Sequence, residues 1–386
     1  MTRVPLEVLV ATAAVFSAAH TFAQGEGPVQ IETIQGNRVE PGTIASSVAG
    51  LMQQSGVTGL SLAVVHDGTV VYTGAFGALD RCGTTPVGDR TVFRAASLSK
   101  PVFAYLIMKL VDRRAIDLDT PLFRYLPEPL FTYPRYRDLR DDRRFATITA
   151  RWVLSHQTGF PNWRWQNKDE RLDIKFPPGR RFAYSGEGYE YLQFVVENKL
   201  GRSLQQLARE HVFTPLGMTR SSFVLEERFE GCIATEFAGV PEFLKTRMRT
   251  EASAAGSLVT TAADYGRFLA AVMRGEGLTP ESAREMIRPQ VQVASTRMFG
   301  PLSVQEGSAP GGLAWCLGWG RFATRLGDAI FHVGREPGCE NYVVAYLQRG
   351  VGMVVLAAGE GREAVSPKLV ARVIGDAYSP FEWAGY

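Results

Sequence analysis

The sequence predicts an α+β fold, an α/β sandwich in which one antiparallel sheet is built from N- and C-terminal segments and flanked by helices. Short runs rich in β-branched and aromatic residues lie near both ends of the chain. Residues 60–77 predict a hairpin around an Asp67-Gly68 turn, and three or four further runs lie within 314–359. The middle of the chain, about 115–310, carries apolar residues at helical spacing and is predicted to form an inserted, mainly helical lobe.

Each element is predicted in chain order from its periodicity and turn signals. Helices are expected over 41–54 and from about 97 to 114, and the second is apolar almost all round, which is typical of a buried central helix. The helical lobe is expected to contain helical segments at 148–156, 189–200, 204–213 and 263–275. The C-terminal strands are expected at 314–323, 328–334, 341–348 and 351–359, followed by a last helix at about 363–378.

These elements predict a single domain over about 40–380. The sheet lobe comprises about 40–114 and 311–380, and the helical lobe comprises about 115–310. A chain of 386 residues, of which 45% are hydrophobic, is long enough to bury an ample core. Residues 24–39 are expected to be an N-terminal linker.

The first 23 residues are predicted to be a secretory signal. Arg3 precedes an apolar stretch at 8–19, and residues 21–23 form a small-x-small cleavage site that ends at Ala23. Glu7 interrupts this pattern, and a buried N-terminal helix is the alternative. Removal of the signal predicts a secreted or periplasmic protein. No other segment has the roughly 18 unbroken apolar residues that a membrane span requires, so no stable span is expected.

The charge of the chain gives no sign of a nucleic-acid partner. The net charge of +3 is small for 386 residues, and no basic run is interleaved with aromatic residues. The arginine-rich stretch at 135–144 alternates with aspartates, which is typical of a solvated surface. The sequence gives no indication of the oligomeric state.

The cysteine and histidine residues predict no metal site. The five histidines are scattered, and the spacing of Cys82, Cys232, Cys316 and Cys339 fits no zinc site, so neither a metal nor another cofactor is expected. Buried free thiols and one or two disulfides are both compatible with this cysteine pattern. If a disulfide forms, Cys316 and Cys339 are the best pair, because both fall near ends of predicted strands.

Residues 93–100, FRAASLSK, contain the candidate nucleophile. Ser97 and Lys100 lie one helical turn apart on the same face. A serine hydroxyl is a poor nucleophile until a base takes its proton, and a partly desolvated lysine can act as that base. Ser99 is adjacent to Lys100 and would point elsewhere, so Ser97 is the better candidate. The alternative is an ordinary helix start with a serine cap.

Two later segments supply partners for this pair. Tyr184, in Tyr184-Ser185-Gly186, is a candidate to relay the proton to a leaving group. His332-Val333-Gly334 lies on a predicted strand, where the glycine would let a substrate backbone approach. Each residue also has a structural interpretation, as a half-buried aromatic or a strand histidine. His156, in LSHQTG, is expected to fix a loop rather than to act in catalysis.

Together the three motifs resemble those of the serine β-lactamase and penicillin-binding-protein superfamily, closest to its class C β-lactamase, D-peptidase and esterase branch. That superfamily orders its motifs S-x-x-K, Y-x-N and K-T-G or H-x-G. The likeness continues outside the motifs and covers about 40–378, with similar stretches at 154–163, 213–223, 254–269 and 332–344. The resemblance implies a β-lactamase/transpeptidase-like fold and a catalytic function for the whole domain.

The resemblance also implies a role for each motif residue. Ser97 would be acylated, Lys100 would be its base, and Tyr184 would share that role and pass the proton to the leaving group. The backbone N–H of Ser97 and one from the strand after His332 would form the oxyanion hole. The strand around Gly334 would hold the substrate.

Two positions depart from the commonest pattern of this superfamily. Gly186 stands where an asparagine usually contacts a substrate amide, and His332 stands where β-lactamases use a lysine against a carboxylate. Arg335 could compensate in substrate binding, but on a regular strand it would face away from His332. Glu187 either holds Lys100 protonated or, as favoured here, is a solvated residue at a helix start.

The sequence therefore predicts a secreted serine hydrolase that cleaves a small-molecule ester, amide or peptide through an acyl-enzyme at Ser97. The substrate could be a β-lactam, a D-amino-acid peptide or a carboxylic ester, and the two departures favour an esterase. The alternative is a catalytically silent sensor that binds cell-wall peptides or antibiotics. Retention of Ser97, Lys100 and Tyr184 together favours the enzyme.

Overall fold

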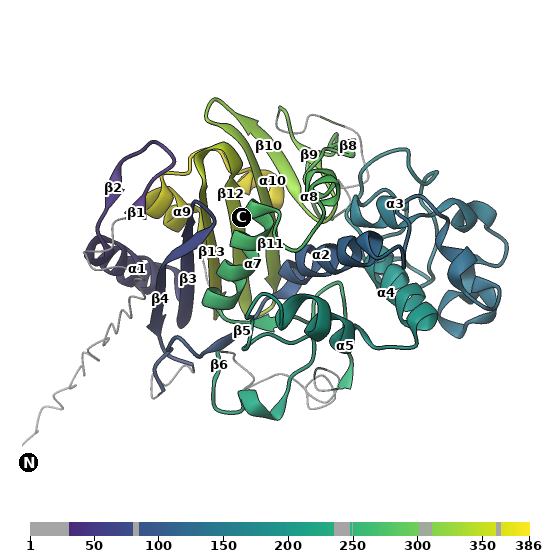
Figure 1. Ribbon diagram of the computed structural model, residues 1–386, viewed down its shortest axis with the longest axis horizontal. Coiled ribbons are helices and arrows are strands. Elements are labelled where there is room, and N and C mark those ends of the chain that lie inside the picture. The colour runs from purple at the N-terminus through teal and green to yellow at the C-terminus, as the bar shows by residue number, and fades with distance from the viewer. Residues whose placement is uncertain are drawn as a thin grey trace, which may run out of the picture.

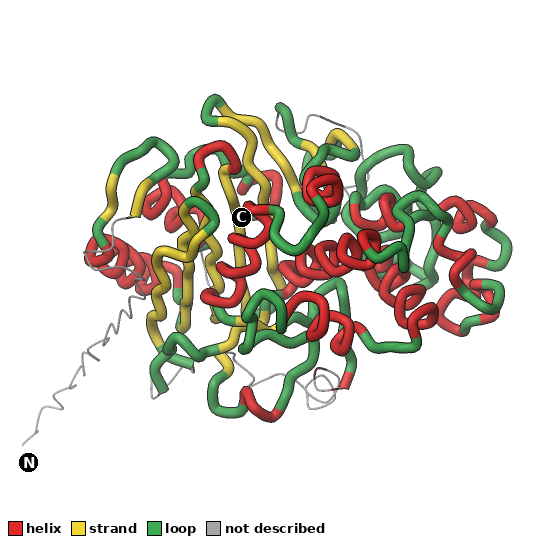
Figure 2. Tube along the Cα trace, viewed as in Figure 1, coloured by secondary structure: helices red, strands yellow, loops and turns green. Residues whose placement is uncertain are grey.

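The computed structural model describes residues 31–79, 85–234, 248, 250–300, 307, 311–359 and 364–386. The predicted signal segment and Cys82 lie outside these residues. The described part consists of a large sheet with helices on both faces, beside a lobe that is mainly helical (Figure 1). Coloured by secondary structure, the strands gather in one half of the molecule and most helical turns in the other (Figure 2).

In the described part of the chain, the sheet has eight antiparallel strands in the order β4-β3-β13-β12-β11-β10-β9-β8. Because β3 pairs with β13 along its whole length, the N- and C-terminal parts of the chain form one sheet, as the sequence predicts. The strands are β3 (Gly59–His66), β4 (Thr69–Gly77), β8 (Val291–Gln292), β9 (Ala314–Trp315), β10 (Gly320–Thr324), β11 (Gly327–Glu336), β12 (Cys339–Tyr346) and β13 (Val351–Ala358).

The hairpin β3–β4 turns where the sequence predicts it. Asp67 and Gly68 both have positive φ, of 45° and 69°, as a two-residue turn that matches the twist of the strands requires. Alternate side chains of β3 then enter two different cores: Leu62 belongs to one core and Ala63 to the other.

Helices cover both faces of this sheet (Figure 1). On one face α9 (Ser366–Ile374) contacts β12 and β13 and packs against α1 (Pro41–Ser55). On the other face α7 (Ala262–Arg274) contacts β3, β4 and β13. The predicted central helix is α2 (Ser99–Asp112), which is buried from Ser99 to Met108 and leads from the sheet into the helical lobe.

The helical lobe is built from short helices and single turns. Among the described residues, its α-helices are α3 (Ala150–Leu154), α4 (Gly186–Leu200), α5 (Leu204–Ala208) and α8 (Pro280–Met286). The helix predicted over 204–213 changes to a π-helical turn at Arg209–Phe213. The helix predicted over 148–156 ends at Leu154, because the buried His156 adopts a left-handed conformation with φ of 57°.

Small sheets complete the described structure and were not predicted. Strand β5 (Val92–Arg94) pairs with β6 (Ile233–Ala234) and β7 (Val259–Thr260), and it leads directly into the segment that carries Ser97. A second small sheet joins β1 (Ile31–Glu32) to β2 (Arg38–Val39), and a final helix, α10 (Phe381–Ala384), follows α9.

The structure also corrects one predicted strand and decides between the alternatives for the cysteines. The single strand predicted over 314–323 is divided into β9 and β10, because Gly318 turns with φ of 84° where it meets Ala104 of α2. Cys316 and Cys339 are free buried thiols, which is one of the two alternatives that the sequence left open, and Cys232 is also unpaired and is partly exposed. Burial raises the pKa of both Cys316 and Cys339 to about 12, which keeps these thiols unreactive.

None of the helices in the described ranges combines the length and the apolar character needed to cross a membrane.

Candidate active site

Ser97 lies in η1 (Ala96–Leu98), a single 3₁₀ turn between β5 and α2. The residue before it, Ala96, has φ of 47°, a left-handed conformation that costs a non-glycine residue about 1–2 kcal/mol. Ser99 holds this turn in place: its hydroxyl donates to the Ala96 carbonyl at 2.6 Å and accepts from the Leu258 N–H at 2.9 Å. Both hydrogen bonds of the Ser99 hydroxyl therefore go to backbone groups, whereas the Ser97 side chain faces Lys100.

Lys100 is a fully buried amine in contact with this hydroxyl. Its Nζ donates to Ser97 Oγ at 3.1 Å and to the Ala255 carbonyl at 2.7 Å. Burial lowers the pKa of Lys100 to about 7, against the opposing charges of Glu190 and Glu336. An amine with this pKa is partly neutral at neutral pH, so it can accept a proton from Ser97.

Tyr184 closes a second side of the site. Lys100 Nζ lies 4.8 Å from the centroid of its ring, and its hydroxyl is buried. Burial raises the pKa of Tyr184 above its usual value, and the neighbouring Ser97 hydroxyl opposes this only partly. Tyr184 therefore keeps its proton, which suits a relay to a leaving group better than the first removal of the proton from Ser97.

His332 lies on β11, and its ring centroid is 6.1 Å from that of Tyr184. Its Nδ1 and the Val333 carbonyl form a hydrogen bond of 2.8 Å, while Nε2 has no partner among the described residues. Burial, and then the charge of Lys100, lower the pKa of His332 to about 3. The imidazole is thus neutral at pH 7 and cannot supply the positive charge of a lysine at this position.

Gly334 lets β11 pass directly against the turn that carries the nucleophile. A Cβ at this position would collide with the Ala95 carbonyl and lie 3.0 Å from Leu98. The pairing of β11 with β10 ends at Phe331, so among the described residues the segment from His332 to Glu336 pairs only with β12.

Arg335 is not brought to this site. Its guanidinium donates to the Gly385 carbonyl and lies 4.9 Å from the centroid of the Tyr386 ring. It therefore lies on the side of β11 opposite His332 and Gly334, as strand alternation predicts.

Glu187 lies at a helix start, as predicted, but it is neither solvated nor bonded to Lys100. Only 2% of it is exposed, and its carboxylate pairs with Arg164. The Arg164 side chain donates from Nε to one carboxylate oxygen at 3.0 Å and from Nη2 to the other at 2.7 Å. Gly186, beside it, is buried at the start of α4, and its N–H donates to the Asn162 side chain at 3.0 Å.

His156 is a site residue whose position the sequence did not predict. Its Nδ1 accepts the Ser185 N–H at 3.1 Å, and its ring centroid lies 4.2 Å from that of Tyr184. Burial, and then the charge of Lys100, hold the pKa of His156 well below its usual value. The histidine does fix a loop, as predicted, but it also supports the ring of Tyr184. A sequence signal for this role of His156 did exist: a histidine stands at a tight helix end, where a glycine is usual.

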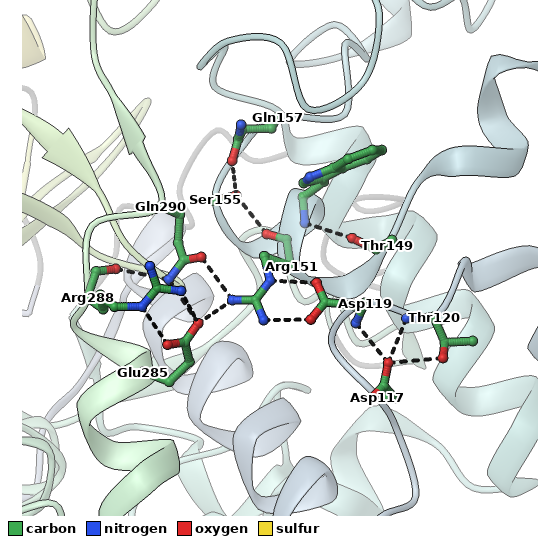
Figure 3. Close-up of polar contacts among 11 residues, drawn as sticks. Asp117, Asp119, Thr120, Thr149, Arg151, Ser155, Gln157, Glu285, Arg288 and Gln290 are labelled. Atoms are coloured by element: carbon green, nitrogen blue, oxygen red, sulfur yellow. Dashed lines mark hydrogen bonds and ion pairs between the residues drawn. The ribbon is translucent and has the colours of Figure 1, made fainter.

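The loop with His156 is attached to a polar network that crosses the lobe (Figure 3). The Ser155 hydroxyl donates to the Arg151 carbonyl at 2.7 Å and to the Gln157 side chain at 2.9 Å. The Arg151 guanidinium pairs with Asp119 at 2.6 Å and also binds Glu285 of α8. Hydrogen bonds from Arg288 and Arg151 lower the pKa of Glu285 to about 2. The network fixes α3 against α8, and so fixes the loop that supports Tyr184.

The described residues therefore bring Ser97, Lys100, Tyr184, His332 and Gly334 together and leave Arg335 apart. This arrangement offers a hydroxyl nucleophile, a buried amine of low pKa and a protonated phenol in one place. Such a set can transfer an acyl group through a covalent serine intermediate. Within the described ranges no three His, Cys, Asp or Glu side chains come together as metal ligands would.

Comparison with known proteins identifies relatives across most of the chain. A family model described as Beta-lactamase matches residues 44–374. Penicillin-binding protein 4 of Amycolatopsis lactamdurans is 26% identical over 339 residues, which cover 83% of this chain and 86% of that protein. Esterase EstB of Burkholderia gladioli is 28% identical over 202 residues, which cover 46% of this chain and 50% of the esterase.

A solved structure described as a beta-lactamase/D-alanine carboxypeptidase from Pseudomonas syringae has the same fold. It superimposes with a TM-score of 0.65 at 18% identity and covers 87% of this chain and 99% of that chain.

Proposed function

Because this chain belongs to the beta-lactamase family, we propose that it is a serine hydrolase that cleaves an ester or amide through an acyl-enzyme at Ser97, with esters as its better substrates. The observation that carries this proposal is the contact between Lys100 Nζ and Ser97 Oγ, at 3.1 Å, together with the lowered pKa of the amine. Burying a lysine costs free energy, and this cost is explained if the amine must be neutral to act as a base.

In the proposed reaction Ser97 Oγ attacks the carbonyl carbon of the substrate while its proton passes to Lys100 Nζ. The negative charge on the carbonyl oxygen is stabilised by the N–H of Ser97 and one N–H of β11 after His332. The bond to the leaving group then breaks, and that group takes the proton from Lys100 through the Tyr184 hydroxyl. Water hydrolyses the acyl-enzyme by the same route in reverse, which restores the serine and releases the acid.

The preference for esters rests on the groups that would hold a carboxylate or an amide. His332 is neutral, Arg335 is held by the C-terminal residues, and Gly186 has no side chain to offer a substrate amide. The names of the relatives, which include both an esterase and a penicillin-binding protein, are compatible with this choice. We further propose one catalytic domain over 40–380 that acts outside the cytoplasm after removal of residues 1–23.

Labelling with a fluorophosphonate tests the proposal and separates the enzyme from a silent sensor. The purified protein should acquire one label, which mass spectrometry should locate on Ser97, and Ser97→Ala should acquire none. The wild-type protein should also hydrolyse p-nitrophenyl butyrate faster than nitrocefin or a D-Ala-D-Ala peptide. A folded protein that takes no label and turns over none of these substrates would contradict the proposal.

A further inference from the structure

The position where the superfamily usually has an asparagine is covered by an aromatic ring in this chain. A Cβ placed on Gly186 would lie 2.7–2.9 Å from three ring carbons of Trp163. The indole therefore packs directly on the backbone of Gly186, which follows Tyr184 by two residues, a distance of at most about 7 Å along the chain. Trp163 thus lies within the reach of a small substrate bound at Tyr184.

A second tryptophan extends this surface toward the solvent. The rings of Trp163 and Trp165 are stacked, with centroids 4.6 Å apart and planes inclined by 10°. Trp165 is 59% exposed, and within the described ranges no other large hydrophobic side chain is as open to solvent. A large aromatic face that remains in water beside a candidate active site is typical of a surface that a ligand covers.

The residue between the two tryptophans holds them in place. The Arg164 N–H and its guanidinium both bind the buried carboxylate of Glu187, in the first turn of α4. The Asn162 carbonyl also accepts the N–H groups of Gly186 and Glu187, at 3.0 and 3.1 Å. The loop is therefore attached on both sides of Trp163 to the start of α4, so the aromatic surface exists before a substrate binds.

We propose that Trp163 and Trp165 bind the acyl group of the substrate and select esters whose acyl group is aromatic or broadly apolar. This inference rests on the proposed function, because it assigns the acyl side of the same site. A planar apolar acyl group can stack on the exposed face of Trp165 and contact the edge of the Trp163 ring. A polar acylamino group finds an aromatic ring in place of the hydrogen-bonding asparagine.

The test compares p-nitrophenyl phenylacetate with p-nitrophenyl acetate, two esters that share a leaving group and differ by one phenyl ring. The ratio of kcat/KM for phenylacetate to that for acetate should fall about tenfold in Trp163→Ala and several-fold in Trp165→Ala. Trp163→Phe should retain most of the ratio. Trp152→Ala is the matched control, since Trp152 is a half-buried tryptophan that packs over another glycine, Gly179, and the ratio should not change.

A ratio that stays within twofold of wild type in both alanine variants would overturn the inference. Trp165 is exposed, so Trp165→Ala should fold and decides the question even if Trp163→Ala does not. If Ser97 is labelled by the fluorophosphonate and the ratio is insensitive, only this inference fails. If no label is acquired and neither ester is hydrolysed, the proposed function itself fails.

Discussion

Ser97 and Lys100 are joined by a hydrogen bond of 3.1 Å at the point where a 3₁₀ turn becomes the central helix. Their separation by three residues brings the hydroxyl and the amine to the same side, and burial of the helix start removes water from the amine. The 3₁₀ turn thus supplies the nucleophile, and the buried start of α2 supplies the base and the desolvation that lowers its pKa to about 7.

Alanine substitutions of the two serines should have opposite effects. Ser97→Ala should lower kcat for p-nitrophenyl butyrate by at least about 10³-fold, because no covalent route remains, and should leave the melting temperature nearly unchanged. Ser99→Ala should retain the chemistry but lose about 1–3 kcal/mol of unfolding free energy, because it leaves the buried Leu258 N–H without its acceptor. Steady-state kinetics and denaturant unfolding check both. Retained turnover in Ser97→Ala would refute the choice of nucleophile.

The pH dependence of activity should report the titration of Lys100. The neutral amine is the active form, so kcat/KM should rise with pH and level off above about 7. The pKa of His332 is lowered to about 3 and that of His156 lies well below its usual value, so neither histidine can produce this limb. Lys100→Arg, which remains charged at every accessible pH, should be inactive throughout. If Lys100→Arg is active and its kcat/KM still rises with pH, the group that titrates is not Lys100.

The same titration should appear in stability. The pKa of Lys100 is about 7 in the folded state and near 10.5 when unfolded, so between these values the unfolded chain binds the extra proton. The free energy of unfolding should therefore rise with pH over this window, and below about pH 7 it should not vary with the Lys100 titration, because the full cost of the buried charge is present there. Lys100→Met should lack this rise in denaturant titrations at several pH values. An identical slope in both proteins would show that the amine is not desolvated.

Glu187→Gln should destabilise the protein by about 3 kcal/mol, because it leaves the Arg164 guanidinium without its buried partner. Glu276→Gln is a suitable control, since Glu276 pairs with Arg274 on the surface and its loss should cost less than about 1 kcal/mol. Denaturant unfolding measures both. Equal losses would mean that the Arg164–Glu187 pair behaves like a surface pair.

Gly186→Asn should not create an efficient β-lactamase. The new side chain would meet the Trp163 ring, so the single variant should melt lower and gain no nitrocefin hydrolysis. In a Trp163→Ala background the asparagine has room, and the ratio of nitrocefin to acetate turnover should rise about tenfold over Trp163→Ala alone. A gain of nitrocefin activity in the single variant would show that the indole does not limit this position.

Features that depend on a local sequence pattern could be predicted well. The hairpin at Asp67-Gly68 and the central helix follow from turn chemistry and periodicity, and Ser97 and Lys100 are only three residues apart. The relation between Gly186 and Trp163 could not be predicted, because residues distant in sequence meet only through the path of a loop. The partner of Glu187 was missed for the same reason.

The position of two cysteines near strand ends did not indicate whether they lie close enough to pair. Cys316 follows β9 and Cys339 begins β12, but strands β10 and β11 lie between them in the sheet. The division of the strand over 314–323 was missed because it depends on a contact with Ala104, far away in sequence.

The order of strands in the sheet has a consequence for the kinetics of folding. Strand β3 is made early, but its neighbour β13 is made only after the whole helical lobe, so the central pairing closes a very long loop. Such non-local pairing is slow, and until it occurs the apolar strand β3 lacks one of its two neighbours in the sheet. A chain of this design should collapse late, remain exposed to aggregation during synthesis and depend on chaperones for its yield.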